Sequence, residues 1–171
     1  MTLETERLIL REPEPEDAEE YLKIHNSEFV LKYNAMTPKT LETVRKQFVG
    51  DHDDLMLVIE SKDNGAVIGS VSVEEDSVRW GVASKELSYF LGEQYSKQGY
   101  MKEALAVLID YLFEVENLLC ISARCFAPNM ASRKLLETFG FQQNGYIPSC
   151  VKGYGDIIYD DTLYSLFRKN V

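Results

Sequence analysis

The most constraining feature of this sequence is a long apolar helical face that lies between two short β-rich runs. Seven apolar residues recur at the spacing of one helix face: Met101, Ala104, Leu105, Leu108, Ile109, Leu112 and Phe113. The run "LLCISARCF" at 118–126 is nearly all apolar, as in a strand that is buried on both faces. The run "KELSYFLG" at 85–92 precedes the helix, and a strand–helix–strand crossover of this length favours a parallel pair of strands.

The remaining elements follow from changes in the apolar period and from turn and capping residues. Further strands are expected at 6–12, at 55–61, at 66–75, and on both sides of a turn near Gly153 to Asp156. Further helices are expected at 15–26, at 37–50 with Thr37 as N-cap and Pro38 as first helical residue, and at 128–141 with Asn129 as N-cap and Gly140 past the end. The sequence therefore predicts one α+β domain over residues 1–171.

Composition narrows the class of partner. The formal net charge of −10, from 28 acids and 18 bases, would repel a nucleic-acid backbone. The same acidity would attract a basic partner, or it would simply keep the protein soluble. Cys120, Cys125 and Cys150 show no C-x-x-C spacing, which indicates reduced thiols and no metal site. No basic-then-apolar leader or long apolar run is present, so we expect a cytoplasmic protein without membrane contact.

The loop "QYSKQGYMKEAL" at 94–105 collects a glycine, two amides and a lysine at the start of the long helix. The first N–H groups of a helix have no partner inside it and lie at the positive end of its dipole, so they can hold a phosphate. A simple turn into the helix would use the same residue types. The loop alone does not decide between the two.

Several longer segments resemble a known family. They are "LETERLILREPEPEDAEEY", "ELSYFLGEQYSKQGYMKEAL", "ARCFAPNMASRKLLETFGF" and "DDTLYSL". Together they are similar to the GNAT N-acetyltransferases, and among these to the RimJ/RimL-like branch that acetylates the N-termini of ribosomal proteins. The resemblance implies the GNAT fold, with a central mixed, mostly antiparallel sheet of six to seven strands flanked by about four helices. It also implies acetyl-CoA as cosubstrate, without a metal.

The resemblance assigns the cofactor-binding residues. The strand at 86–91 would give backbone groups to the pantetheine arm, and a bulge there would free an N–H near Phe90 or Leu91 to polarise the thioester carbonyl. The loop residues Lys97, Gln98, Gly99, Tyr100 and Met101 would surround the pyrophosphate. The loop departs from the family pattern Q/R-x-x-G-x-G/A at Ser96, Lys97 and Met101. A side chain as large as Met101 would crowd the phosphates, and the charge of Lys97 would compensate.

Asn129 and Ser132 match the N-x-x-S stretch of the family, in which the asparagine contacts pantetheine and the serine lies near the thiol. In many other GNAT enzymes, a tyrosine seven residues after the asparagine is the general acid that protonates the departing thiolate. This chain has Leu136 at that position. Ser132 is then the candidate donor to the departing thiolate. Alternatively, Ser132 only supports the first turn of the helix, in which it is the third residue.

Glu86 is the candidate general base, acting through water on the acceptor amine. Alternatively, Glu86 is only a solvated carboxylate at the end of a strand, without a catalytic role. His25 and His52 lie in or beside helical segments, and surface roles are expected for both. The function implied is acetyl transfer to a primary amine, most simply the α-amino group of a protein or peptide, including a basic N-terminus. The alternatives are a small amine such as a polyamine, amino acid or antibiotic, and a non-catalytic acyl-CoA-binding module; a monomer or a homodimer fits each.

Overall fold

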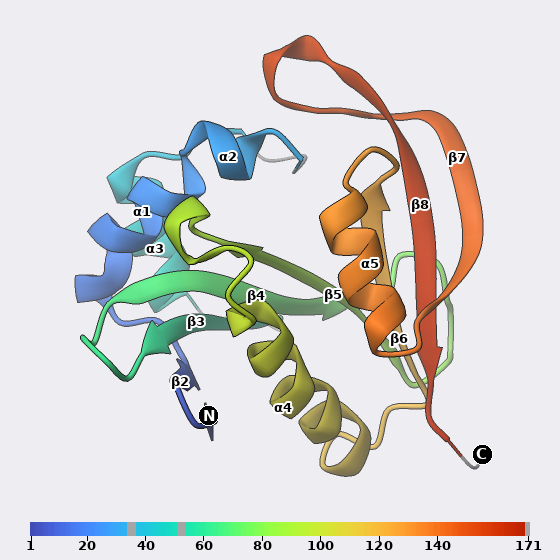
Figure 1. Ribbon diagram of the computed structural model, residues 1–171, viewed down its shortest axis with the longest axis horizontal. Coiled ribbons are helices and arrows are strands. Elements are labelled where there is room, and N and C mark those ends of the chain that lie inside the picture. The colour runs from blue at the N-terminus through green and yellow to red at the C-terminus, as the bar shows by residue number, and fades with distance from the viewer. Residues whose placement is uncertain (34–36, 51–53, 170–171) are drawn as a thin grey trace.

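The computed structural model describes residues 1–33, 37–50 and 54–169. One sheet has the strand order β1-β2-β3-β4-β5-β6-β8-β7 (Figure 1). The strands are β1 (Thr2–Glu4), β2 (Leu8–Arg11), β3 (Leu55–Ser61), β4 (Val67–Glu75), β5 (Ser84–Leu91), β6 (Cys120–Phe126), β7 (Gln142–Lys152) and β8 (Ile158–Phe167). The helices are α1 (Ala18–His25), α2 (Glu28–Leu31), α3 (Leu41–Val49), α4 (Tyr100–Glu114) and α5 (Met130–Thr138).

The predicted parallel pair is present. β5 and β6 run parallel on the two sides of the α4 crossover, whereas all other neighbouring strands are antiparallel. The sheet has eight strands rather than six to seven, because three residues at the N-terminus form β1 beside β2. So short a strand has no apolar alternation from which it could be read.

The N-cap predicted at Thr37 is wrong. The third helix begins at Leu41, and the Thr40 side chain accepts a hydrogen bond from the Thr43 N–H. Both threonines are suitable caps, so the choice depends on contacts from outside the segment. The Asn26 side chain bonds both backbone groups of Lys39, at 2.8 and 2.9 Å, and holds the chain out of the helix up to that point. The short α2, capped by Ser27, was not predicted.

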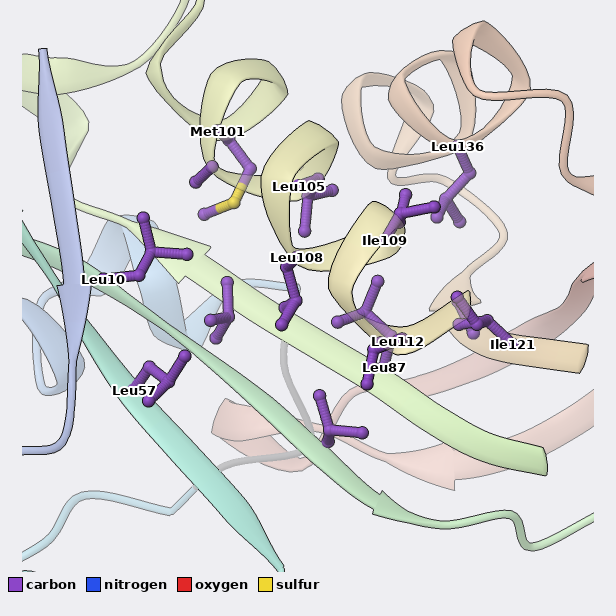
Figure 2. Packing of buried hydrophobic residues seen from close by; sticks show 14 of the residues in the cluster. Leu10, Leu57, Leu87, Met101, Leu105, Leu108, Ile109, Leu112, Ile121 and Leu136 are labelled. Carbon is purple, nitrogen blue, oxygen red and sulfur yellow. The ribbon is translucent and has the colours of Figure 1, made fainter. Parts of the chain in front are cut away.

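The larger core lies between one face of the sheet and the helices α4 and α5, which cover that face (Figures 1 and 2). The predicted apolar face of α4 supplies the buried residues Met101, Ala104, Leu105, Leu108, Ile109 and Leu112. Figure 2 shows several of them packed with Leu10, Leu57 and Leu87 from the strands. A smaller cluster on the opposite face packs α1 and α3 against β3 and β4. In the last crossover, Asn129 caps α5 and Gly140 has φ +89, both as predicted.

β5 contributes to both faces because successive side chains alternate. Tyr89 and Leu91 pack with the α4 face, and Phe90 packs with the α1 face. The register pairs Glu86 with Glu74 and Ser88 with Ser72. These polar residues therefore share the face of Phe90, beside the helices α1 and α3. No helix in the described ranges is both long and apolar enough to cross a membrane.

The surface role expected for His25 is wrong, because its side chain is 0% exposed. Its ring lies among Tyr21 and Phe90, and its Nδ1 is 2.9 Å from Asn26 Oδ1. Its Nε2 has no hydrogen-bond partner among the described residues. Burial lowers the pKa of His25 below its ordinary value of 6.5, with a smaller effect from Lys39. His52 lies outside the described residues.

Acid should therefore destabilise the fold through His25. The unfolded chain binds the proton more readily, so this contribution to stability is complete above about pH 6.5 and is lost as the pH falls below it. We expect the free energy of unfolding to decline between about pH 7 and about pH 5, and the decline to be shallower in His25→Phe, which keeps the aromatic contacts. Urea unfolding at each pH measures this difference. Parallel declines in both proteins would contradict it, since the carboxylates are common to both.

Candidate active site

A cleft opens where the parallel strands β5 and β6 separate. Their pairing covers only Ser84–Leu87 and Cys120–Ala123, although β5 continues to Leu91 and β6 to Phe126. The cleft has a volume of about 930 Å³ and is lined by both strands, by the starts of α4 and α5, and by the α1–α3 region. It joins the two faces of the sheet. A ligand that enters from the α4 side and one that enters from the α1 side would therefore meet there.

The backbone of β5 presents N–H groups to this opening. Along a strand, the N–H groups of alternate residues point to the same side. Gly92 N donates to Ile68 O of β4 at 2.9 Å, so the Phe90 N–H also points toward β4. The N–H groups of Tyr89 and Leu91 point to the other side, toward the opening. The β4–β5 register has no shift, so the bulge expected in β5 is absent. Of the two residues assigned from the sequence, Leu91 offers its N–H and Phe90 contributes its ring to the small core.

The glycine loop lies at one end of the cleft. Gly99, with φ +84, is the N-cap of α4, and Lys97 also lies in the left-handed region at φ +60. As the N-cap, Gly99 has no side chain that could accept from the first N–H groups of α4. A row of backbone donors thus points outward from the start of the longest helix. Lys97, Gly99, Tyr100 and Met101 line the cleft beside these donors, and the exposed Gln98 completes the loop.

The loop is held from behind by residues that directly precede β2. Arg7 Nη1 donates to Gln98 O at 3.2 Å, and Arg7 Nη2 lies 2.6 Å from Glu103 Oε2 in α4. Glu103 also accepts from the Thr5 hydroxyl and from the Arg7 N–H. The guanidinium stacks over the Tyr100 ring, 4.3 Å from its centroid. This cluster fixes the loop before any ligand arrives.

Met101 does not extend toward the loop donors. Its side chain is 8% exposed and points into the main core from the first turn of α4 (Figure 2). The crowding expected from its size is therefore relieved by its direction. The apolar period of the sequence had already placed Met101 on the buried face of the helix. For the direction of this side chain, the apolar period was a better guide than the mismatch with the family pattern.

A pair of hydroxyls lies at the centre of the cleft. Asn129 Oδ1 accepts from Ser132 N at 3.2 Å, and Ser132 Oγ lies 2.8 Å from the hydroxyl of Tyr89. Leu136, one helical turn beyond Ser132, is 0% exposed and belongs to the core. The phenol near Ser132 is thus supplied by β5 and not by α5. Tyr89 was not predicted as a site residue, because it lies 43 positions from Ser132 in the sequence.

Glu86 lies at the opposite end of the cleft, next to Glu74. Glu86 Oε2 accepts from the Ser77 hydroxyl at 2.5 Å. Partial desolvation by its neighbours, together with the charges of Asp54 and Glu86, raises the pKa of Glu74. Glu74 was not predicted as a site residue, and the β4–β5 register places it directly opposite Glu86. Within the described ranges, no group of three or more His, Cys, Asp or Glu side chains could hold a metal ion.

Positive side chains face these acids. Lys39, from the α1–α3 region, lies close enough to Glu74 for their charges to interact, and burial lowers the pKa of Lys39. Lys32 also lines the cleft. Arg124 on β6 is paired with Asp161 on β8 at 2.7 Å. The end of the cleft near Glu74 and Glu86 therefore carries both signs of charge, so the net negative charge of the whole chain does not describe it.

Comparison with known proteins agrees with this geometry. Residues 7–142 match the family model described as the acetyltransferase (GNAT) domain. The chain is 33% identical over 175 residues to the uncharacterized N-acetyltransferase p20 of Bacillus licheniformis, covering 98% of this chain and 97% of that protein. It is 24% identical over 172 residues to the uncharacterized N-acetyltransferase YnaD of Bacillus subtilis, covering 99% of this chain and 98% of that protein.

Solved structures share the fold. A ribosomal-protein alanine acetyltransferase from Vibrio fischeri superposes with a TM-score of 0.86 at 24% identity, covering 99% of this chain and 98% of that one. The ribosomal-protein α-N-acetyltransferase RimL, in complex with coenzyme A, superposes with a TM-score of 0.84 at 18% identity, covering 98% of each chain. The chain therefore belongs to the GNAT family, with neighbours in its RimJ/RimL-like branch, and is an N-acetyltransferase that uses acetyl-CoA.

Proposed function

We propose that this enzyme acetylates the N-terminal α-amino group of a protein or peptide, most simply a ribosomal protein in the cytoplasm. The observation that carries the proposal is the cleft itself, which passes between β5 and β6 from the glycine loop to the exposed Glu74 and half-buried Glu86. An opening reached by solvent at the acceptor end suits a chain terminus that extends away from the site. The ribosomal-protein acetyltransferases among the structural neighbours support this choice of acceptor.

The cofactor would bind along the α4 side of the cleft. The uncapped N–H groups at Gly99, Tyr100 and Met101 supply donors for the pyrophosphate at the positive end of the helix dipole. Lys97 and Gln98 add a charge and an amide at the exposed rim of the loop. This arrangement binds a doubly charged group without a metal.

The pantetheine arm and the thioester would lie farther into the cleft. The Leu91 N–H is directed toward the opening and would donate to the carbonyl oxygen of the acetyl group, and Phe90 would position this stretch through its packing. Asn129 borders the cleft at the start of α5, and Ser132 would hydrogen-bond the departing thiolate. Donors aimed at the oxygen and the sulfur stabilise the charges that develop during transfer.

Glu86 would act as general base through a water molecule. It lies on β5, and its carboxylate is already oriented by Ser77. Glu74, directly opposite in register, is a second carboxylate that faces the same acceptor amine. Its proximity keeps negative charge at this end of the cleft, which attracts the ammonium form of the acceptor.

A small amine is the alternative acceptor. Lys39 and Lys32 would repel a polyamine, whereas an amino acid would place its carboxylate near them and its amine near the acids. An antibiotic amine would need a wider apolar surface, which Phe29 and Tyr33 at the same end provide.

Replacement of Met101 tests the glycine loop. Because its side chain is buried away from the donors, we expect Met101→Ala to lower the free energy of unfolding by about 2–5 kcal/mol. We expect its Kd for coenzyme A to change by less than about twofold. Urea unfolding and calorimetric titration measure the two quantities. Met101→Leu, which conserves volume, is the matched control for folding, and markedly tighter binding by Met101→Ala would mean that the side chain does crowd the phosphates.

Replacement of each acid tests the base. Because a general base speeds transfer by taking the proton of the acceptor amine, Glu86→Gln should flatten the rising limb of the pH–rate profile. Glu74→Gln is the matched variant and should keep the limb while raising KM for the acceptor. Both profiles come from release of free thiol at saturating acetyl-CoA. An unchanged profile in Glu86→Gln together with a flat one in Glu74→Gln would transfer the role to Glu74.

A panel of acceptors tests the substrate class. Peptides with a free α-amine should give thiol release and a mass increase of one acetyl group, whereas the same peptides blocked at the N-terminus but carrying a lysine should not. A polyamine, a free amino acid and an antibiotic amine complete the panel. Acetylation of one of these small amines, with the peptides untouched, would overturn the peptide assignment and leave the chemistry of the site in place.

A further inference from the structure

The hydroxyl of Tyr89 bridges the two walls of the cleft. Tyr89 is on β5 and Ser132 is on α5, and their oxygen atoms are 2.8 Å apart. Both side chains are half-buried, and both line the cleft that also contains the glycine loop, Glu74 and Glu86. The contact therefore lies where the acetyl donor and the amine would meet.

The chemistry of the two hydroxyls decides which one donates. A phenol is a stronger acid than an aliphatic alcohol, so the Tyr89 O–H is the better donor and Ser132 Oγ the better acceptor. Burial raises the pKa of Tyr89, so the phenol keeps its proton at neutral pH. The hydrogen of Ser132 is then free to point to another acceptor.

The other neighbours of Ser132 leave that direction open. Its backbone N–H is taken by the Asn129 side chain, which fixes the first turn of α5. The nearby thiol of Cys125 is within 3.2 Å of Thr162 Oγ1, and burial raises the pKa of this thiol. A neutral thiol is a weak acceptor, so it competes poorly for the serine hydrogen.

We propose that Tyr89 is a positioning residue for acetyl transfer, and that its hydrogen bond to Ser132 Oγ directs the serine hydrogen toward the sulfur of coenzyme A. This inference rests on the proposed role of Ser132. In the reaction the amine nitrogen bonds to the acetyl carbon, the C–S bond breaks, and its electron pair remains on sulfur. The proton lost by the nitrogen finally neutralises the thiolate through solvent, while Tyr89 and Ser132 keep their own protons.

Kinetics on four variants give the first readout. We expect Tyr89→Phe to lower kcat by about threefold to tenfold, the loss of one oriented hydrogen bond, without changing the Kd for coenzyme A or KM for the acceptor. Because Tyr89 acts through Ser132, Tyr89→Phe should add nothing in a Ser132→Ala background. Tyr111→Phe removes a phenol on α4 that donates to Glu116, just past the end of this helix, and is the matched control. Independent, multiplying effects of Tyr89→Phe and Ser132→Ala would overturn the proposal.

The thiol of bound coenzyme A gives a second readout that needs no acceptor. A donor aimed at sulfur stabilises the thiolate, so its pKa in the wild-type complex should be lower than in Tyr89→Phe or Ser132→Ala. Ultraviolet absorbance of the thiolate during a pH titration measures this pKa. An equal thiol pKa in wild type and Tyr89→Phe would refute the role of Tyr89 even if transfer to peptides is established. Failure of every peptide in the panel, with the pKa difference present, would refute only the acceptor assignment.

Discussion

The structure depends on one limited contact, the parallel pairing of β5 and β6 that stops after Leu87 and Ala123. Both strands continue past that point, so the backbone groups that β5 and β6 direct toward each other no longer pair there. Unpaired backbone groups in the interior of a protein are costly unless a ligand or water satisfies them. In the proposed function, the same opening provides donors for the cofactor on one side and a passage to the acceptor on the other. The site is therefore a consequence of how the sheet separates.

The position of the glycine loop depends on residues far away in sequence. Arg7 and Thr5 hold Glu103, and through it the first turn of α4, while Arg7 also bonds the carbonyl oxygen of Gln98. The loop then presents its N–H groups in a fixed direction, which reduces the entropy lost when a phosphate binds. Thr5 and Arg7 thus support the proposed cofactor site without lining it.

The predictable part of the fold was the part with strong local signals. The apolar period of α4 and the caps at Asn129 and Gly140 were read correctly, because each depends on residues within one or two turns. The N-cap at Thr40 was missed, because Asn26 decides it from another segment. The same distinction separates the site residues: Gly99 and Ser132 lie in readable motifs, whereas Tyr89 reaches Ser132 only across the folded cleft.

By itself, the sequence determined the α+β class, the parallel crossover and the resemblance to GNAT enzymes, since apolar period and motif spacing are local properties. Only the tertiary structure decided that Phe90 is held in the β4 ladder and that Glu74 stands beside Glu86. It also brought Lys39 close to Glu74. The physical reason is that the direction of a side chain and the charge around it depend on strands and helices that meet only after the chain has folded.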